Sequence, residues 1–138
     1  MMTDRGYLEK VCEATQARSY EASVTGTTTH TIRKLPAPAA AAKFTGPELT
    51  VAEKIDWGPA DAAGNRTGRV SMSVPGQPVT MQGTVVLSAD GLGTVGELTG
   101  VLKVAIPILG KKLEQAAAPA VLAGFRTQQK IGDAWLAT

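Results

Sequence analysis

The hydrophobic period of the chain changes at Leu109, and this change limits the fold more than any other feature of the sequence. Between Val70 and Ile106, apolar and polar residues alternate, as they do in strands with one buried face and one face in water. After Leu109, apolar residues recur at helical spacing to the end of the chain. We therefore expect residues 66–138 to form three antiparallel strands, followed by one long helix that covers their apolar face.

The inward face of these three strands is given by the alternating apolar residues. They are Val70, Met72 and Val74 in the first strand, Val79, Met81, Gly83, Val85 and Leu87 in the second, and Leu98, Leu102, Val104 and Ile106 in the third. Residues 75–78 and 89–91 contain the glycine and proline that tight turns require, and Pro107 ends the last strand.

The predicted helix has an apolar stripe and a charged opposite face. The stripe comprises Leu109, Leu113, Ala117, Val121, Gly124, Gln128, Ile131 and Trp135, and is widened by Leu122, Phe125 and Leu136. The charged residues are Lys112, Arg126, Lys130 and Asp133. Pro119 lies on the same outer face, where an interior proline is expected to curve the helix around the surface it packs on.

The first half of the chain predicts further elements of the same domain. We expect a helix over residues 4–17 with Asp4 as its N-cap, and a hairpin over residues 20–35 that turns at Gly26. A short helix over residues 39–44, a strand over residues 48–57 and a loop over residues 58–68 follow. The expected fold is one α+β domain spanning residues 1–138, a helix-grip arrangement of an antiparallel sheet wrapped around a long C-terminal helix.

Composition favours a soluble cytoplasmic domain. Of the 138 residues, 43% are hydrophobic and 19% are charged, and no apolar run approaches the roughly 20 residues that a membrane span needs. The N-terminus lacks the apolar core of a secretory signal, and the single Cys12 cannot form an internal disulfide. Nucleic-acid binding is not expected, because the net charge is only +2, the basic residues are scattered and aromatic residues are few.

The string formed by Gly91, Gly93 and Gly96 has the Gly-x-Gly-x-x-Gly spacing of dinucleotide-binding loops. That motif binds phosphate only where it joins a strand to a helix, whereas here it joins two predicted strands. We interpret these glycines as turn residues, and no cofactor is expected. His30 is the only histidine and falls short, with Cys12, of the three or four ligands that zinc needs, so no metal site is expected either. Cys12 occupies an apolar position of a helix, which favours a packing role.

Glu53 is a carboxylate on the predicted inward face of its strand. A buried carboxylate is costly unless it is paired or functional, so Glu53 is either an acid in a pocket or a residue of an edge-like or bulged strand. We favour the second alternative, in which Glu53 is wet or paired with a lysine or arginine.

The middle of the long helix, residues 115–124, consists mainly of alanine. Small side chains there leave space where the helix crosses the sheet, and opposing large side chains or a ligand must fill that space. Met72 and Met81 on the facing strands suit either role.

The sequence also resembles an actinobacterial-type family of unknown function in the START-like (SRPBCC) superfamily, which includes polyketide cyclases and lipid-transfer proteins. The likeness lies in Glu48–Trp57, in residues 68–79 and in residues 98–114, and extends over residues 7–136. These are packing and turn motifs, which indicate a fold rather than a chemistry. Relative to that superfamily, the chain lacks a first strand and helix. Either the sequence begins downstream of the true start of the domain, or the sheet is closed differently, as by a homodimer through the uncovered strand edge.

The small-residue helix centre and the resemblance together imply a protein that binds an apolar small molecule or lipid between helix and sheet. The residues expected to bind it are Met72, Met81, Val85, Leu98, Leu102, Leu113, Ala117, Val121 and Gly124. One alternative is an enzyme of the cyclase or dehydratase kind, in which His30, Glu53 or Tyr20 moves protons. Another is a protein-interaction module whose core is filled by its own side chains.

Overall fold

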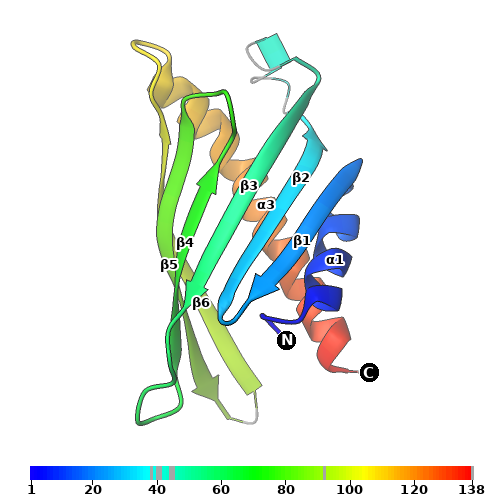
Figure 1. Ribbon diagram of the computed structural model, residues 1–138. Helices are drawn as coiled ribbons and strands as arrows, with labels where there is room; N and C mark the ends of the chain where they lie inside the picture. Colours follow the sequence, from blue (N-terminus) through cyan, green and yellow to red (C-terminus); the bar gives the residue numbers. More distant parts are fainter. Residues whose placement is uncertain (38, 40–41, 44–45, 92, 138) are drawn as a thin grey trace.

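The computed structural model describes residues 1–37, 39, 42–43, 46–91 and 93–137 (Figure 1). Its elements are α1 (Arg5–Ala14), β1 (Ser19–Thr25), β2 (Thr28–Pro36), β3 (Glu48–Trp57), β4 (Arg66–Ser73), β5 (Val79–Asp90), β6 (Gly93–Val104) and α3 (Gly110–Leu136). These bounds agree with the predicted strands, with the predicted N-terminal helix and with the predicted long C-terminal helix to within about five residues. The short helix predicted over residues 39–44 falls largely outside the described residues.

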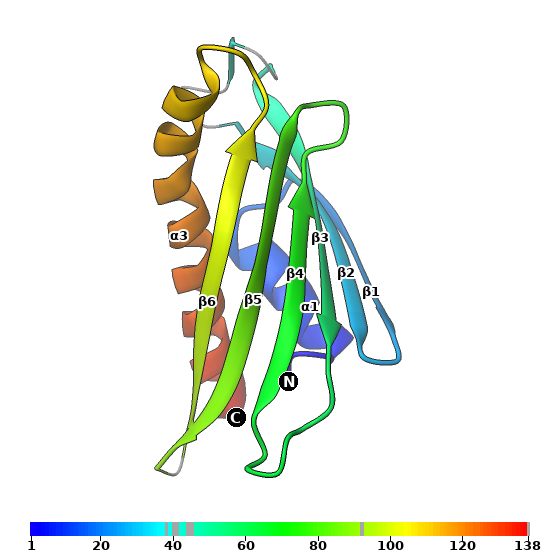
Figure 2. The ribbon, with the colours of Figure 1, turned by 90° about the vertical axis from the view of Figure 1, so that its left-hand side faces the viewer.

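The six strands form one sheet in the order β1-β2-β3-β4-β5-β6, with every neighbouring pair antiparallel. Both helices lie on the same face of this sheet, as Figures 1 and 2 show from two sides. The 27-residue α3 runs beside β6 and then meets α1, which packs on β1. The α+β helix-grip arrangement predicted from the sequence is therefore confirmed.

The strand register aligns the inward residues in rows across the sheet. In one row Thr31 of β2 is paired with Glu53 of β3, Glu53 with Met72 of β4, Met72 with Met81 of β5, and Met81 with Leu102 of β6. Since side chains alternate along a strand, all five point toward the helices. Glu53, Met72, Met81 and Leu102 of this row line the cavity described below.

The compact core lies toward one end of the sheet. Ile55, Trp57, Val70 and Met81 form a buried cluster, and Val121 and Phe125 of α3 pack against it. Gly68 permits this packing, because a Cβ atom there would lie 2.9 Å from side-chain atoms of Ile55 and Trp57.

The faces of α3 follow the predicted pattern with two exceptions. The charged face and Pro119 are exposed, whereas most of the apolar stripe is half-buried. Leu122 and Leu136, expected to widen that stripe, are 55% and 69% exposed. The prediction for these two leucines was wrong. Leu122 stands three residues after Pro119 and four before Arg126, so its spacing places it on the exposed face, and Leu136 is the last residue of the helix.

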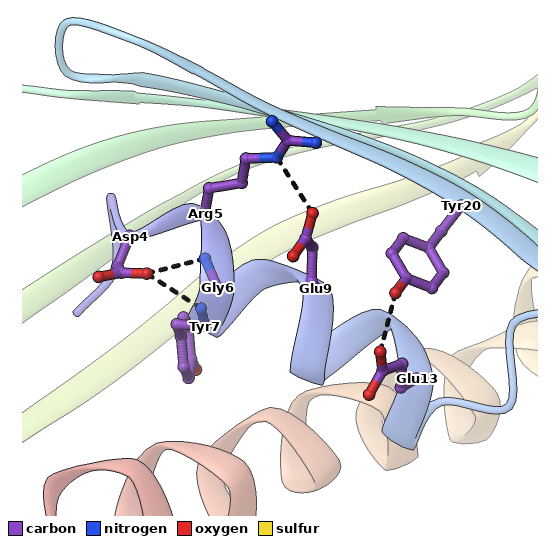
Figure 3. A network of polar contacts seen from close by, with 7 residues as sticks. All are labelled: Asp4, Arg5, Gly6, Tyr7, Glu9, Glu13 and Tyr20. Atoms are coloured by element: carbon purple, nitrogen blue, oxygen red, sulfur yellow. Dashed lines mark hydrogen bonds and ion pairs between the residues drawn. The ribbon is translucent and has the colours of Figure 1, made fainter.

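Helix α1 is held by its cap and by an aromatic contact with α3. The Asp4 carboxylate accepts hydrogen bonds from the backbone N–H groups of Gly6 and Tyr7, at 2.8 and 3.3 Å (Figure 3). The Tyr7 ring meets Trp135 edge to face with ring centres 6.0 Å apart, and its hydroxyl donates to the Gln128 carbonyl oxygen at 3.3 Å. These contacts fix α1 against the C-terminal half of α3.

Candidate functional site

A cavity of about 500 Å³ lies between the sheet and α3. Its wall is formed by the last residues of β2, β4 and β6 and by the first residues of β3 and β5. The end of α1 and the N-terminal two-thirds of α3 complete the wall. Some lining residues, such as Gln16, Pro36 and Ala120, are exposed, so the cavity opens to solvent at this end of the molecule. Its volume is within the roughly 300–1,000 Å³ that is typical of small-molecule sites.

The small residues of α3 create this space. Ala116, Ala117, Ala120, Ala123 and Gly124 all line the cavity. A Cβ atom built on Gly124 would meet no atom within 4 Å. The segment 115–124, whose small side chains were predicted to leave space, therefore borders this cavity.

Most residues expected to bind a ligand lie on the wall of this cavity. Those that line it are Met72, Met81, Leu102, Leu113, Ala117, Val121 and Gly124. Val85 and Leu98 do not line it, because they are paired with each other further along β5 and β6 and pack against the core cluster.

Arg33 and Glu53 place an ion pair in the otherwise largely apolar wall. Their side chains are only 6% and 9% exposed, and Arg33 Nη2 donates to Glu53 Oε2 at 3.5 Å. Arg33 Nη1 donates to Thr15 Oγ1 at the same distance. Arg33 Nε is buried and has no hydrogen-bond partner in the part of the chain that the structure describes.

Burial raises the pKa of Glu53, and the nearby Arg33 charge opposes that rise without cancelling it. Pairing with an arginine, one of the outcomes expected for Glu53, is observed. The favoured edge-like or bulged strand was wrong, because β3 lies between β2 and β4 in continuous register with each. Glu53 instead lines the cavity, as the other alternative, an acid in a pocket, expected.

The structure does not bring the three catalytic candidates together. His30 is exposed and lies one position away from Thr31 on β2, so it points to the opposite face of the sheet from Glu53. Tyr20 donates its hydroxyl to Glu13 Oε1 at 2.8 Å, a bond that raises the pKa of Tyr20 (Figure 3). Of the three candidates, only Glu53 lines the cavity.

The remaining motifs have structural roles. Cys12 is buried, and burial raises the pKa of its thiol, which disfavours the thiolate that a nucleophile needs. Gly91 adopts a positive φ of 62° between β5 and β6, and Gly93 begins β6, so the glycine string joins two strands as predicted. Among the described residues, no group of three potential metal ligands is present, and no helix is long and apolar enough to cross a membrane.

A family model described as a protein of unknown function, DUF2505, matches residues 1–136. The chain belongs to the DUF2505 family. No curated protein and no solved structure matches it significantly. The family description names no activity. The cavity is the feature of this DUF2505 chain that indicates a function.

Sequence reasoning missed one important residue of this DUF2505 site, Arg33. The Thr- and Ile-containing strand β2 gives no apolar alternation, and its inward residues are in fact Thr29, Thr31 and Arg33, while Ile32 is 43% exposed. Pairing β2 with β3 would have revealed it, because an inward Glu53 places Thr31 and its same-face neighbour Arg33 inward as well.

Proposed function

We propose that the protein binds an apolar small molecule or lipid in the cavity between the sheet and α3, without catalysing a reaction on it. The observation that carries this proposal is the void of about 500 Å³ in front of the alanine-rich part of α3. Protein interiors are close-packed, so a space of this size next to Met72, Met81 and Leu102 suits an occupant.

The alternatives receive less support. A core filled by its own side chains does not agree with a cavity of this volume. An enzyme of the cyclase or dehydratase kind would have to rely on Glu53, since His30 and Tyr20 lie outside the cavity.

The helix-grip architecture also supports, as a proposal, kinship with the START-like superfamily. A cytoplasmic place of action stays a prediction from the sequence. A homodimer through a strand edge stays a prediction: β1 and β6 are the edges of the sheet, and sedimentation velocity of the purified chain would detect such a dimer.

Binding is tested first with the protein as purified. Native mass spectrometry followed by solvent extraction should reveal a retained apolar molecule, and the extracted protein should then bind the uncharged dye Nile red. Consistent absence of both would end the proposal.

A matched pair of variants locates the bound dye. Ala117→Leu together with Ala120→Leu adds bulk to the cavity wall, whereas Ala134→Leu adds the same side chain at an exposed position of α3 that does not line the cavity. The double variant should lose Nile red binding, and Ala134→Leu should keep it. Equal binding by both variants would place the dye elsewhere.

A further inference from the structure

The cavity wall changes from polar to apolar across the sheet. Arg33 and Glu53 line it on the neighbouring strands β2 and β3, and Met72, Met81 and Leu102, in register with Glu53, line it on β4, β5 and β6. Opposite them, α3 contributes four alanines and Gly124 among its lining residues. A ligand that matches this wall has a polar group at one end and a hydrocarbon body.

At the polar end of the cavity, the hydrogen-bonding capacity of Arg33 is only partly satisfied. It is 5% exposed and lines the cavity. Both of its hydrogen bonds, to Glu53 and Thr15, are 3.5 Å long, against the roughly 2.7–2.9 Å of charge-assisted bonds, and its Nε has no partner among the described residues. Buried polar groups are normally bonded, so a guanidinium with two long hydrogen bonds and an unpaired Nε is incompletely satisfied. An acceptor in the cavity that Arg33 lines would satisfy it better.

The charge balance specifies that acceptor. Among the described residues that line the cavity, Glu53 carries the only carboxyl group. It lies 3.5 Å from the Arg33 guanidinium, and burial raises its pKa, so it is a weak counterion for that cation. An oxygen anion of a ligand would supply a stronger one.

We propose that the cavity binds an amphipathic monocarboxylate, with the carboxylate at Arg33 and the hydrocarbon body between the methionines of the sheet and the small residues of α3. This inference rests on the proposed function and deepens it by naming the ligand's chemical class. The planar guanidinium fork suits a carboxylate, which can accept two of its N–H donors at once.

The test compares three twelve-carbon probes that differ only in their polar group: dodecanoate, 1-dodecanol and dodecylamine. Each displaces Nile red from the extracted full-length chain at pH 7, and the dissociation constants are compared. Dodecanoate should bind about tenfold more tightly than dodecanol, as expected for one added charge-assisted hydrogen-bonded contact. Equal binding of the two, or tightest binding of dodecylamine, would overturn the proposal.

Two variants assign the preference to Arg33. Arg33→Met with Glu53→Met removes both charges together, so no buried charge is left alone and folding is expected to persist. This double variant should still bind dodecanol and should lose the preference for dodecanoate. Glu53→Gln keeps Arg33 and removes the competing carboxylate, so dodecanoate should bind it more tightly than the wild type.

The outcomes separate the two proposals. Binding of Nile red and dodecanol with no preference for dodecanoate leaves the apolar cavity as a binding site and rejects the carboxylate. A preference that survives in the double variant also rejects the role of Arg33. If neither Nile red nor any probe binds, both proposals fail together.

Discussion

Arg33 and Glu53 are two charged side chains whose burial the fold must tolerate. Transfer of an ionised group into a protein interior is costly, and its partner compensates only when the geometry is close. Here the pair is separated by 3.5 Å, and burial outweighs the effect of Arg33 on Glu53. Glu53 therefore binds its proton more tightly in the folded than in the unfolded chain.

This preference predicts a pH dependence of stability. The pKa of Glu53 in the folded state lies above its ordinary value of 4.5. Between these two pKa values, Glu53 is mostly protonated in the folded state and mostly ionised in the unfolded state. Stability contributed by Glu53 is therefore present below about pH 4.5 and is lost as the pH rises through the folded pKa. Glu53→Gln lacks this loss.

Urea unfolding of the wild type and Glu53→Gln, at intervals from about pH 4.5 to about pH 8, measures the effect. The free energy of unfolding of the wild type minus that of the variant should fall with rising pH, by at most ~1.4 kcal/mol per pH unit. Other titrating groups are common to both proteins and cancel. A difference that is constant, or that rises with pH, contradicts the buried, proton-favouring environment of Glu53.

Tyr7 allows a second test at the residue scale. Its hydroxyl donates to the Gln128 carbonyl oxygen, and its ring packs on Trp135. Tyr7→Phe removes only the hydrogen bond and should lower the free energy of unfolding by about 0.5–1.5 kcal/mol. Tyr7→Ala also removes the buried ring and should lower it by about 3–5 kcal/mol. Urea unfolding of both variants measures the two losses, and equal losses would mean that the ring does not join α1 to α3.

At the scale of elements, the sequence predicted most of the strands and the beginning of α3, because both have a clear hydrophobic period. It failed where the period is absent or ambiguous. The inward face of β2 carries Thr29, Thr31 and Arg33, which no apolar pattern marks. Leu122 was predicted to widen the buried stripe but is exposed, because it lies at helical spacing from Pro119 and Arg126 on the outer face of α3.

Gly110 and Gly124 of α3 should respond oppositely to substitution by alanine. A Cβ atom at Gly110 would clash with the Val104 carbonyl oxygen, whereas one at Gly124 would meet no atom within 4 Å. Gly110→Ala should therefore destabilise the protein by about 1–3 kcal/mol. Gly124→Ala should stabilise it by about 0.5–1 kcal/mol, because alanine restricts the unfolded chain and favours helix. Thermal unfolding of both variants checks this, and a shift of the same sign in both would contradict the described contact of α3 with the end of β6.

For the whole molecule, the helix-grip architecture and the approximate position of the void could be predicted, whereas the polarity of the void could not. Small residues on α3 and methionines on the strands each belong to one element, so their spacing is visible in the sequence. The contact between Arg33 and Glu53 depends instead on the register between β2 and β3, which are separated along the chain. Such pairings become apparent only when the strands are placed side by side.

A ligand that binds in the cavity should raise the stability of the entire chain. A molecule that binds only the folded state raises the free energy of unfolding by RT ln(1 + [L]/Kd), about 2.7 kcal/mol at a concentration of one hundred times Kd. Dodecanoate at that concentration should therefore shift the urea midpoint upward. The slope of the transition should change little, since the same chain surface becomes exposed on unfolding.

Ala117→Leu with Ala120→Leu serves as the control for this linkage. The added methyl and methylene groups enter the void, so the ligand-free variant should be more stable than the wild type, by up to ~0.8 kcal/mol for each group that becomes buried. Dodecanoate should then stabilise the variant little, because its site is already occupied by leucine side chains. Full ligand stabilisation of this variant, with Ala134→Leu behaving identically, would mean that the ligand acts at another surface and that the void in front of α3 is not its site.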